Sequence, residues 1–192
     1  MWLKETPAEG QSITTLKIVE KIDDDTSILL SACDNGALYD SDKFADLIED
    51  QNNDIVVWSY RNNYTAHRNP DMYSWLDVDG DDIKGVSVKK FTGDNPVDEY
   101  AIVGTMFFRN KSIYNSSLIK LFEMNEKVNG DFYVDSLLNA AIELGYTVKN
   151  FEVDHYICWG TPNDLKTYRY WQNFFNAVNW HSYYYRKDYL TC

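Results

Sequence analysis

Residues 27–36 read SILLSACDNG, an apolar run that ends in a polar turn. The run is continuous rather than alternating, which is typical of a short strand buried on both faces of a sheet. Asp34, Asn35 and Gly36 follow it directly, and these residue types favour a turn. A carboxylate at this point lies at the carboxyl edge of the sheet, where open α/β sheets bind ligands. Asp34 is therefore either a ligand of a hard cation such as Mg²⁺ or a turn residue only, and the pattern favours neither.

The segments around this run alternate between strand and helix patterns. Further strands are predicted over residues 54–60, 73–78, 83–91, 101–108 and 147–156, with 73–91 forming a hairpin. Helices are predicted over residues 11–22, 41–49, 112–126 and 132–144. A last helix is predicted from Thr161, as its N-cap, to about residue 173. We therefore expect one α/β domain over residues 1–175, with a mixed, mostly parallel sheet flanked by helices, and an aromatic tail over residues 176–192.

The charge balance excludes several classes of partner. The chain of 192 residues has 18 Lys and Arg against 30 Asp and Glu, a net charge of −12. This field repels nucleic acids and anionic membrane surfaces, but not a nucleotide that binds through a divalent cation. No apolar run approaches the ~20 residues that span a bilayer, and residues 1–10 do not resemble a secretory signal. Three cysteines are typical of reduced thiols, so we expect a cytoplasmic protein.

Two further charged pairs have alternative interpretations. Lys89 and Lys90 lie at the end of a predicted strand, where neighbouring side chains point to opposite faces. One of them is then a candidate phosphate ligand, or both are solvated edge charges. Asp77 and Asp79 form a D-x-D pattern on the predicted hairpin. That pattern holds a metal in many glycosyltransferases, but a solvated turn is the favoured interpretation here.

Six segments occur in a recognisable order: EGQS (9–12), SACDNG (31–36), VSVKKF (86–91), AIVGTMFF (101–108), GDFYVDSLLNA (130–140) and WGTPNDL (159–165). Together they resemble the sugar-phosphate nucleotidyltransferases, and most closely the cytoplasmic members of bacterial capsule and surface-polysaccharide clusters. The resemblance implies a GT-A-like (Rossmann-like) fold. It also implies an enzyme that transfers a nucleoside monophosphate from an NTP to a sugar 1-phosphate or similar phosphomonoester, with Mg²⁺ as cofactor and pyrophosphate as the second product.

The resemblance assigns roles to individual residues on the nucleotide side. It implies that Gly10 and Gln11 contact the nucleobase and that Asp34, with Asn35 and Gly36 beside it, binds Mg²⁺ and the nucleotide.

On the acceptor side, the resemblance implies that Lys90 contacts the acceptor phosphate, Gly104 lies against the sugar and Asp131 meets sugar hydroxyls. Relatives place a second metal-binding aspartate where this chain has Cys158. Asp154, on the same predicted strand face, is the candidate substitute as metal and substrate ligand.

The family begins with a strand and a glycine- and arginine-rich loop that grips the triphosphate, and no segment here matches it. We therefore expect either a truncated start, lacking the first βαβ unit, or a remnant that needs another polypeptide. Two alternatives to the transferase stay open: a non-catalytic sugar-nucleotide-binding remnant, and a Mg²⁺- or Mn²⁺-dependent GT-A glycosyltransferase that uses Asp77 and Asp79. The aromatic tail packs either on its own core or on a second copy, which makes a homo-oligomer one expectation.

Overall fold

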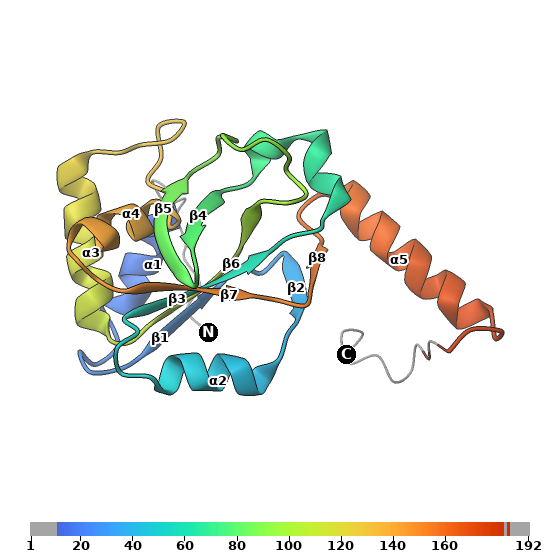
Figure 1. Ribbon diagram of the computed structural model, residues 1–192, viewed down its shortest axis with the longest axis horizontal. Coiled ribbons are helices and arrows are strands. Elements are labelled where there is room, and N and C mark those ends of the chain that lie inside the picture. Colours follow the sequence, from blue (N-terminus) through green and yellow to red (C-terminus); the bar gives the residue numbers. More distant parts are fainter. Residues whose placement is uncertain (1–10, 183, 185–192) are drawn as a thin grey trace.

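The computed structural model describes residues 11–182 and 184 (Figure 1). A six-stranded sheet with the order β1-β6-β3-β7-β5-β4 lies at the centre, and β2 and β8 form a separate two-stranded sheet. The strands are β1 (Ile28–Ser31), β2 (Asn35–Leu38), β3 (Ile55–Tyr60), β4 (Trp75–Asp79), β5 (Asp82–Ser87), β6 (Tyr100–Phe108), β7 (Val148–Glu152) and β8 (His155–Cys158). The helices are α1 (Gln11–Val19), α2 (Ser41–Glu49), α3 (Lys111–Met124), α4 (Ser136–Glu143) and α5 (Pro162–Ala177), with short 3₁₀ turns at Tyr64–Arg68 and Pro70–Met72.

Helices cover the two faces of the large sheet unequally (Figure 1). α1, α3 and α4 lie on one face, over a core that includes Phe108, Leu121 and Leu137. α2 covers part of the other face, over a smaller aromatic core around Trp58 and Phe151. In the described part of the chain, no helix combines the length and the apolar character that crossing a membrane requires.

The sheet is largely antiparallel, so the prediction of a mostly parallel sheet was wrong. Among the strands of the described residues, only β3 and β7 pair in parallel. β6 runs antiparallel to β1, β3 and β4, and β5 runs antiparallel to both β4 and β7. A buried apolar run indicates a strand but carries no information about the direction of its neighbours, so the strand patterns left this feature undetermined.

The first predicted strand occupies a different place from the one expected. β1 is an edge strand of the sheet rather than a strand buried on both faces, and Leu29 on it is 54% exposed. By contrast, all six residues of β3 are buried, as its apolar run predicts. Asp34 therefore follows an edge strand, and a short apolar run such as 27–33 cannot distinguish the two positions.

Other predicted elements change mainly at their ends. Residues 147–156 are not one strand, because the chain leaves the large sheet after β7 and enters the small sheet as β8. β5 ends at Ser87, and α4 starts at Ser136. The helix over 41–49 and the hairpin of β4 and β5 are confirmed. α5 begins after the predicted cap Thr161, whose hydroxyl accepts the backbone N–H of Asp164.

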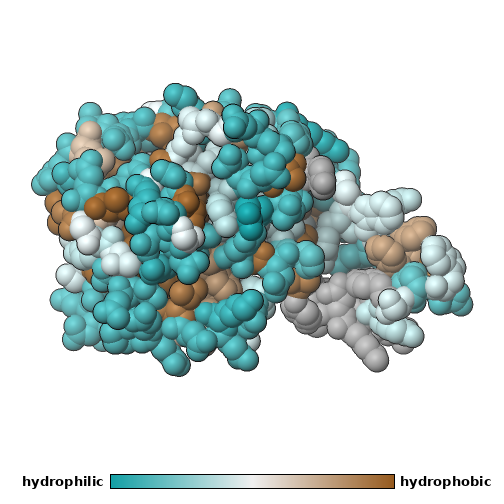
Figure 2. Space-filling model, in the orientation of Figure 1, coloured by the Kyte–Doolittle hydropathy of each residue, from teal (hydrophilic) through white to brown (hydrophobic). Residues whose placement is uncertain are grey.

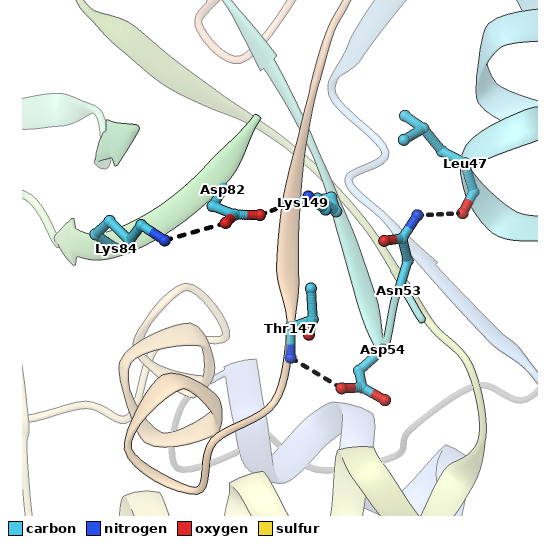
Figure 3. A network of polar contacts seen from close by, with 7 residues as sticks. All are labelled: Leu47, Asn53, Asp54, Asp82, Lys84, Thr147 and Lys149. Carbon is cyan, nitrogen blue, oxygen red and sulfur yellow. Dashed lines mark hydrogen bonds and ion pairs between the residues drawn. The ribbon is translucent and has the colours of Figure 1, made fainter. Parts of the chain in front are cut away.

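Polar contacts fasten the beginning of β7 to its neighbours (Figure 3). The carboxylate of Asp54, just before β3, accepts a hydrogen bond from the backbone N–H of Thr147 at 2.8 Å. Asp82 on β5 pairs with Lys149 on β7 at 2.5 Å and with Lys84 at 3.1 Å, and these ammonium groups lower the pKa of Asp82. The contacts hold the hairpin against β7, where the two strands share only one paired position.

A helix side chain completes the hydrogen bonding of β5. The amide of Asn139 on α4 accepts from the backbone N–H of Val86 at 2.8 Å and donates to its carbonyl oxygen at 2.9 Å. Asn139 therefore replaces a neighbouring strand at this position of β5.

Replacement of this amide tests its contribution to stability. We expect Asn139→Leu to lower the free energy of unfolding by about 2–4 kcal/mol, because it leaves two backbone groups without a partner. Urea denaturation monitored by tryptophan fluorescence measures the change. Gln51→Leu, which removes an exposed amide from a turn, is the control and should change the free energy of unfolding by less than about 0.5 kcal/mol.

Candidate functional site

A cleft of about 730 Å³ opens beside the middle of β6. One edge of β6 pairs with β1 from Thr105 onward and with β4 at Tyr100 and Ala101. Between these two strands the edge is not covered by a neighbouring strand, and Ile102, Val103 and Gly104 line the cleft there. Such a volume is typical of a pocket for a small ligand.

Three backbone and amide contacts hold the turn that carries Asp34. Ala32 donates to the carbonyl oxygen of Gly104 at 2.9 Å, and the side chain of Asn35 donates to that of Val103 at 2.7 Å. From the other side, the backbone N–H of Trp159 donates to the carbonyl oxygen of Asp34 at 2.9 Å. The turn is therefore fixed between β6 and the end of β8.

The Asp34 carboxylate lines the cleft and is exposed. Within residues 11–182 and 184, no group donates a hydrogen bond to it and no cation pairs with it. Its Oδ2 atom lies so close to the Gly160 backbone that a Cβ at residue 160 would approach it to 3.1 Å. The contacts of the turn thus fix the position of Asp34, while both oxygens of its carboxylate stay available for a ligand.

The backbone conformation and the close packing at residue 104 explain why a glycine occurs there. Its φ is +95°, and a Cβ there would lie 3.0 Å from the Cβ of Ala32. A side chain would therefore strain the backbone and press on the turn that precedes Asp34. The glycine gives close access to the floor of the cleft at the same position.

The structure brings together four of the residues selected from the sequence. Gln11, at the start of α1, Asp34, Asn35 and Gly104 all line the cleft, although they come from three separate segments. Gly10 lies outside the described residues. Their contacts with a nucleotide stay predictions.

Four other selected residues do not line the cleft. Gly36 lies under the ring of Trp159, to which a Cβ would approach within 3.0 Å. Asp131 is exposed in a turn paired with Val128, and Asp154 is exposed in the bend between β7 and β8. The fourth is Lys90, and the ligand roles of all four stay predictions without support from this geometry.

The lysine that the cleft presents is Lys89 rather than Lys90. Its ammonium group donates a hydrogen bond to the carbonyl oxygen of Met72 and lies 5.8 Å from the centre of the Tyr133 ring. Lys89 has a φ of +53°, because the chain turns after β5 ends at Ser87. The alternation of a strand therefore does not apply to the two lysines.

Asp135 is a cleft carboxylate that the sequence interpretation missed. It accepts a hydrogen bond from the hydroxyl of Ser74 at 2.5 Å. Burial raises the pKa of Asp135, although the Ser74 hydroxyl and the Lys89 ammonium group lower it in part. The signal was available: Asp135 lies in the quoted segment 130–140, directly before the apolar helix residues that begin α4.

Asp164 is the third cleft carboxylate, at the start of α5. Its Oδ2 atom accepts hydrogen bonds from the hydroxyl of Thr161 at 2.7 Å and from the thiol of Cys158 at 3.6 Å. Burial raises the pKa of Cys158, so this side chain stays a neutral thiol at neutral pH.

The side chains of the cleft fit a hard cation whose other ligands come from a bound phosphate and from water. No group of three or more side chains that could hold a metal ion occurs in the described part of the chain. Mg²⁺ commonly takes one or two protein carboxylates, with phosphate oxygens and water for the rest. Asp34 satisfies that requirement as one carboxylate, whereas a closed, all-protein metal site would require more ligands. Asp77 and Asp79 lie on β4 and do not line the cleft.

Comparison with known proteins shows which solved structures the fold resembles. No protein-family model matches the chain, and no curated protein is similar to it in sequence. Among solved structures, it resembles a nucleoside-diphosphate-sugar pyrophosphorylase from Vibrio cholerae RC9, with a TM-score of 0.63 and 18% identity over 85% of this chain and 66% of that one. It also resembles the inositol-1-phosphate CTP transferase from T. maritima, with a TM-score of 0.59 and 17% identity over 89% of this chain and 64% of that one.

A third similar structure is a Bacillus anthracis protein described as a glucose-1-phosphate thymidylyltransferase, in complex with a sucrose. Its TM-score is 0.63 and its identity 12%, over 92% of this chain and 65% of that one. The chain thus has a mixed α/β fold that resembles nucleotidyltransferases, and it spans 64–66% of the length of these structures.

The raised pKa of Asp135 predicts a pH-dependent effect on stability. A carboxyl group with a raised pKa in the folded state contributes stability at acid pH, and this contribution is lost as the pH rises through the folded value. Asparagine stays neutral at every pH. We therefore expect Asp135→Asn to melt a few degrees above the wild type at pH 7, and the difference to shrink toward zero as the pH falls below 4, near the ordinary pKa of Asp.

Differential scanning fluorimetry across this pH range measures the effect. Asp131→Asn is the matched control, because Asp131 is exposed outside the cleft. A difference that is equally large at acid and neutral pH would contradict the assigned cause.

Proposed function

We propose that this chain is a nucleotidyltransferase domain. It transfers a nucleoside monophosphate from an NTP to a sugar 1-phosphate or a similar phosphomonoester and releases pyrophosphate, in the synthesis of precursors for bacterial capsule or surface polysaccharides. The observation that carries the proposal is the Asp34 carboxylate, unpartnered in the described part of the chain and fixed by its own backbone at the wall of a 730 Å³ cleft. The similarity of the fold to nucleotidyltransferases supports it.

The proposed reaction is an in-line displacement at phosphorus. An oxygen of the acceptor phosphate forms a bond to the α-phosphorus of the NTP, and the bond from that phosphorus to the bridging oxygen of pyrophosphate breaks. The protein contributes position and charge rather than a covalent intermediate. Bound Mg²⁺ would neutralise the charge of the phosphate oxygens.

Four of the residues that line the cleft have a role in this proposal. Asp34 holds Mg²⁺ with the nucleotide, and Gln11 lies where the nucleobase is expected. Lys89, the lysine on the cleft, takes the acceptor phosphate in place of Lys90. Asp135 accepts hydrogen bonds from the hydroxyl groups of the acceptor, in place of Asp131.

A second candidate function is a sugar-nucleotide-binding protein without turnover. The observation that favours it is that, among the described residues, Asp34 is the single cleft carboxylate without a hydrogen-bond partner, since Asp135 and Asp164 each accept one. Both candidates predict that a nucleotide binds in the cleft with Mg²⁺. Release of pyrophosphate in the presence of acceptor separates them, and the same assay on a version extended upstream tests the expected truncated start.

The role of Asp34 is testable by binding alone. With Mg²⁺ present, we expect one of CTP, UTP, dTTP or GTP to bind the wild type, as measured by isothermal titration calorimetry. Asp34→Asn should weaken this binding on the order of tenfold or more, since a metal-binding carboxylate is lost. Asp154→Asn removes an exposed carboxylate outside the cleft and should leave binding unchanged.

Gly160→Ala adds a second, independent variant. Its new methyl group would lie 3.1 Å from the Oδ2 atom of Asp34, so it should displace the carboxylate and weaken binding without removing any charge. If Asp34→Asn and Gly160→Ala both bind nucleotide as the wild type does, the proposed function is refuted.

The choice between the two lysines is testable in the active protein. We expect Lys89→Gln to raise the KM for the phosphorylated acceptor on the order of tenfold, because a charge-assisted hydrogen bond is lost. Lys90→Gln is the matched control and should leave this KM unchanged. The opposite result would return the acceptor phosphate to Lys90 and overturn the role that we propose for Lys89.

A further inference from the structure

The last helix stands away from the rest of the molecule (Figure 1). α5 has 16 residues, and none of them is buried. Within the described residues, it has no extended contact with another helix or strand. A helix of this length is marginally stable in water unless one of its faces is packed. Among the described residues, nothing covers the part of α5 that carries the exposed rings of Tyr170 and Trp171.

The exposed side chains of this region are aromatic. We define the carboxyl arm as residues 162–182. Tyr170 is 61% exposed, Trp171 49% and Trp180 80%. Contacts of Trp171 with Phe174 and Phe175 order these rings on the arm. Figure 2 shows pale to brown side chains along the protruding arm beside a mainly hydrophilic body. An apolar surface of this kind marks an interaction site.

The charge of this region is opposite to that of the rest of the chain. Residues 162–182 contain two Lys and Arg against one Asp, whereas the first 161 residues contain 14 Lys and Arg against 28 Asp and Glu. Lys166 and Arg169 are exposed on α5 itself. The arm is thus complementary in charge to the body of another copy of the chain.

The body offers a matching surface at Tyr39 and α2, which we call the α2 face. Asp42, Asp46 and Glu49 are exposed on it. Its one lysine, Lys43, lies 3.8 Å from Asp40. The ring of Tyr39 is partly exposed and packs on the aromatic core below. This face combines negative charge with an aromatic surface, as a docking site for the arm requires.

We propose that the carboxyl arm of one copy docks on the α2 face of a second copy, and that the second arm docks reciprocally to give a twofold dimer. Fully burying an aromatic side chain covers roughly 150–250 Å². The exposed parts of Tyr170, Trp171 and Trp180 on two arms, with the surfaces that receive them, reach the ~1,000 Å² or more that is typical of a specific interface.

The first test is the mass of the full chain in solution by sedimentation velocity. We expect a dimer that dissociates more readily as the salt concentration rises, because the contact is partly electrostatic. The double variant Tyr170→Glu with Trp171→Glu should be monomeric. Ile119→Glu is the matched control: Ile119 is exposed on α3, and this variant should stay dimeric. A monomeric wild type, or a dimeric arm variant, overturns the proposal.

A charge exchange tests the two surfaces together. Lys166→Glu with Arg169→Glu reverses the arm, and Asp42→Lys with Asp46→Lys reverses the α2 face. Each double variant alone should be monomeric. An equimolar mixture should form a heterodimer, because each arm then meets a face of opposite charge. Only folded proteins can restore association in this way. If both variants are monomeric and the mixture is monomeric too, the α2 face is not the docking site.

Discussion

Two strands, β1 and β4, pair with different parts of the same edge of β6, and the geometry of the cleft depends on this arrangement. β1 pairs with its second half and β4 with its first two residues. The gap between them exposes the backbone around Gly104, whose positive φ and missing side chain let the turn after β1 pass close by. That turn carries Asp34, and its amide neighbour Asn35 hydrogen-bonds to Val103 in the same gap. A change that closed the gap would remove the cleft floor and displace the carboxylate together.

The cleft has more carboxylates than cationic side chains, although we propose that it binds phosphates. Asp34, Asp135 and Asp164 line it against Lys89 and Arg68. Asp164 is engaged with the cap of α5, and Asp135 with Ser74. Asp34 is the carboxylate with no such partner among the described residues, which supports the proposal that a divalent cation binds there. The raised pKa of Asp135 reduces the negative charge further at acid pH.

Much of the fold was predictable because local patterns determine it. The buried run of β3, the helix over 41–49 and the cap of α5 follow from residue types and spacing. Gln11, Asp34, Asn35 and Gly104 were selected from three separate segments and meet in one cleft. Strand direction and the edge position of β1 were not predictable, because they depend on pairing between distant segments. The same holds for Lys89 and Asp135, whose positions follow from where β5 ends and where α4 begins.

Helix α5 belongs to two environments at once. Thr161 and Asp164, at its beginning, form part of the cleft wall, while the remainder of its 16 residues extends outward. A helix of that size is about 24 Å long and stiff, and its first turn lies at the cleft. A contact that fixes the orientation of the C-terminal end of α5 would therefore also restrict the movement of Thr161 and Asp164 at the cleft. A ligand that orders Thr161 and Asp164 would therefore also orient α5, and any coupling between the two events would act equally in both directions.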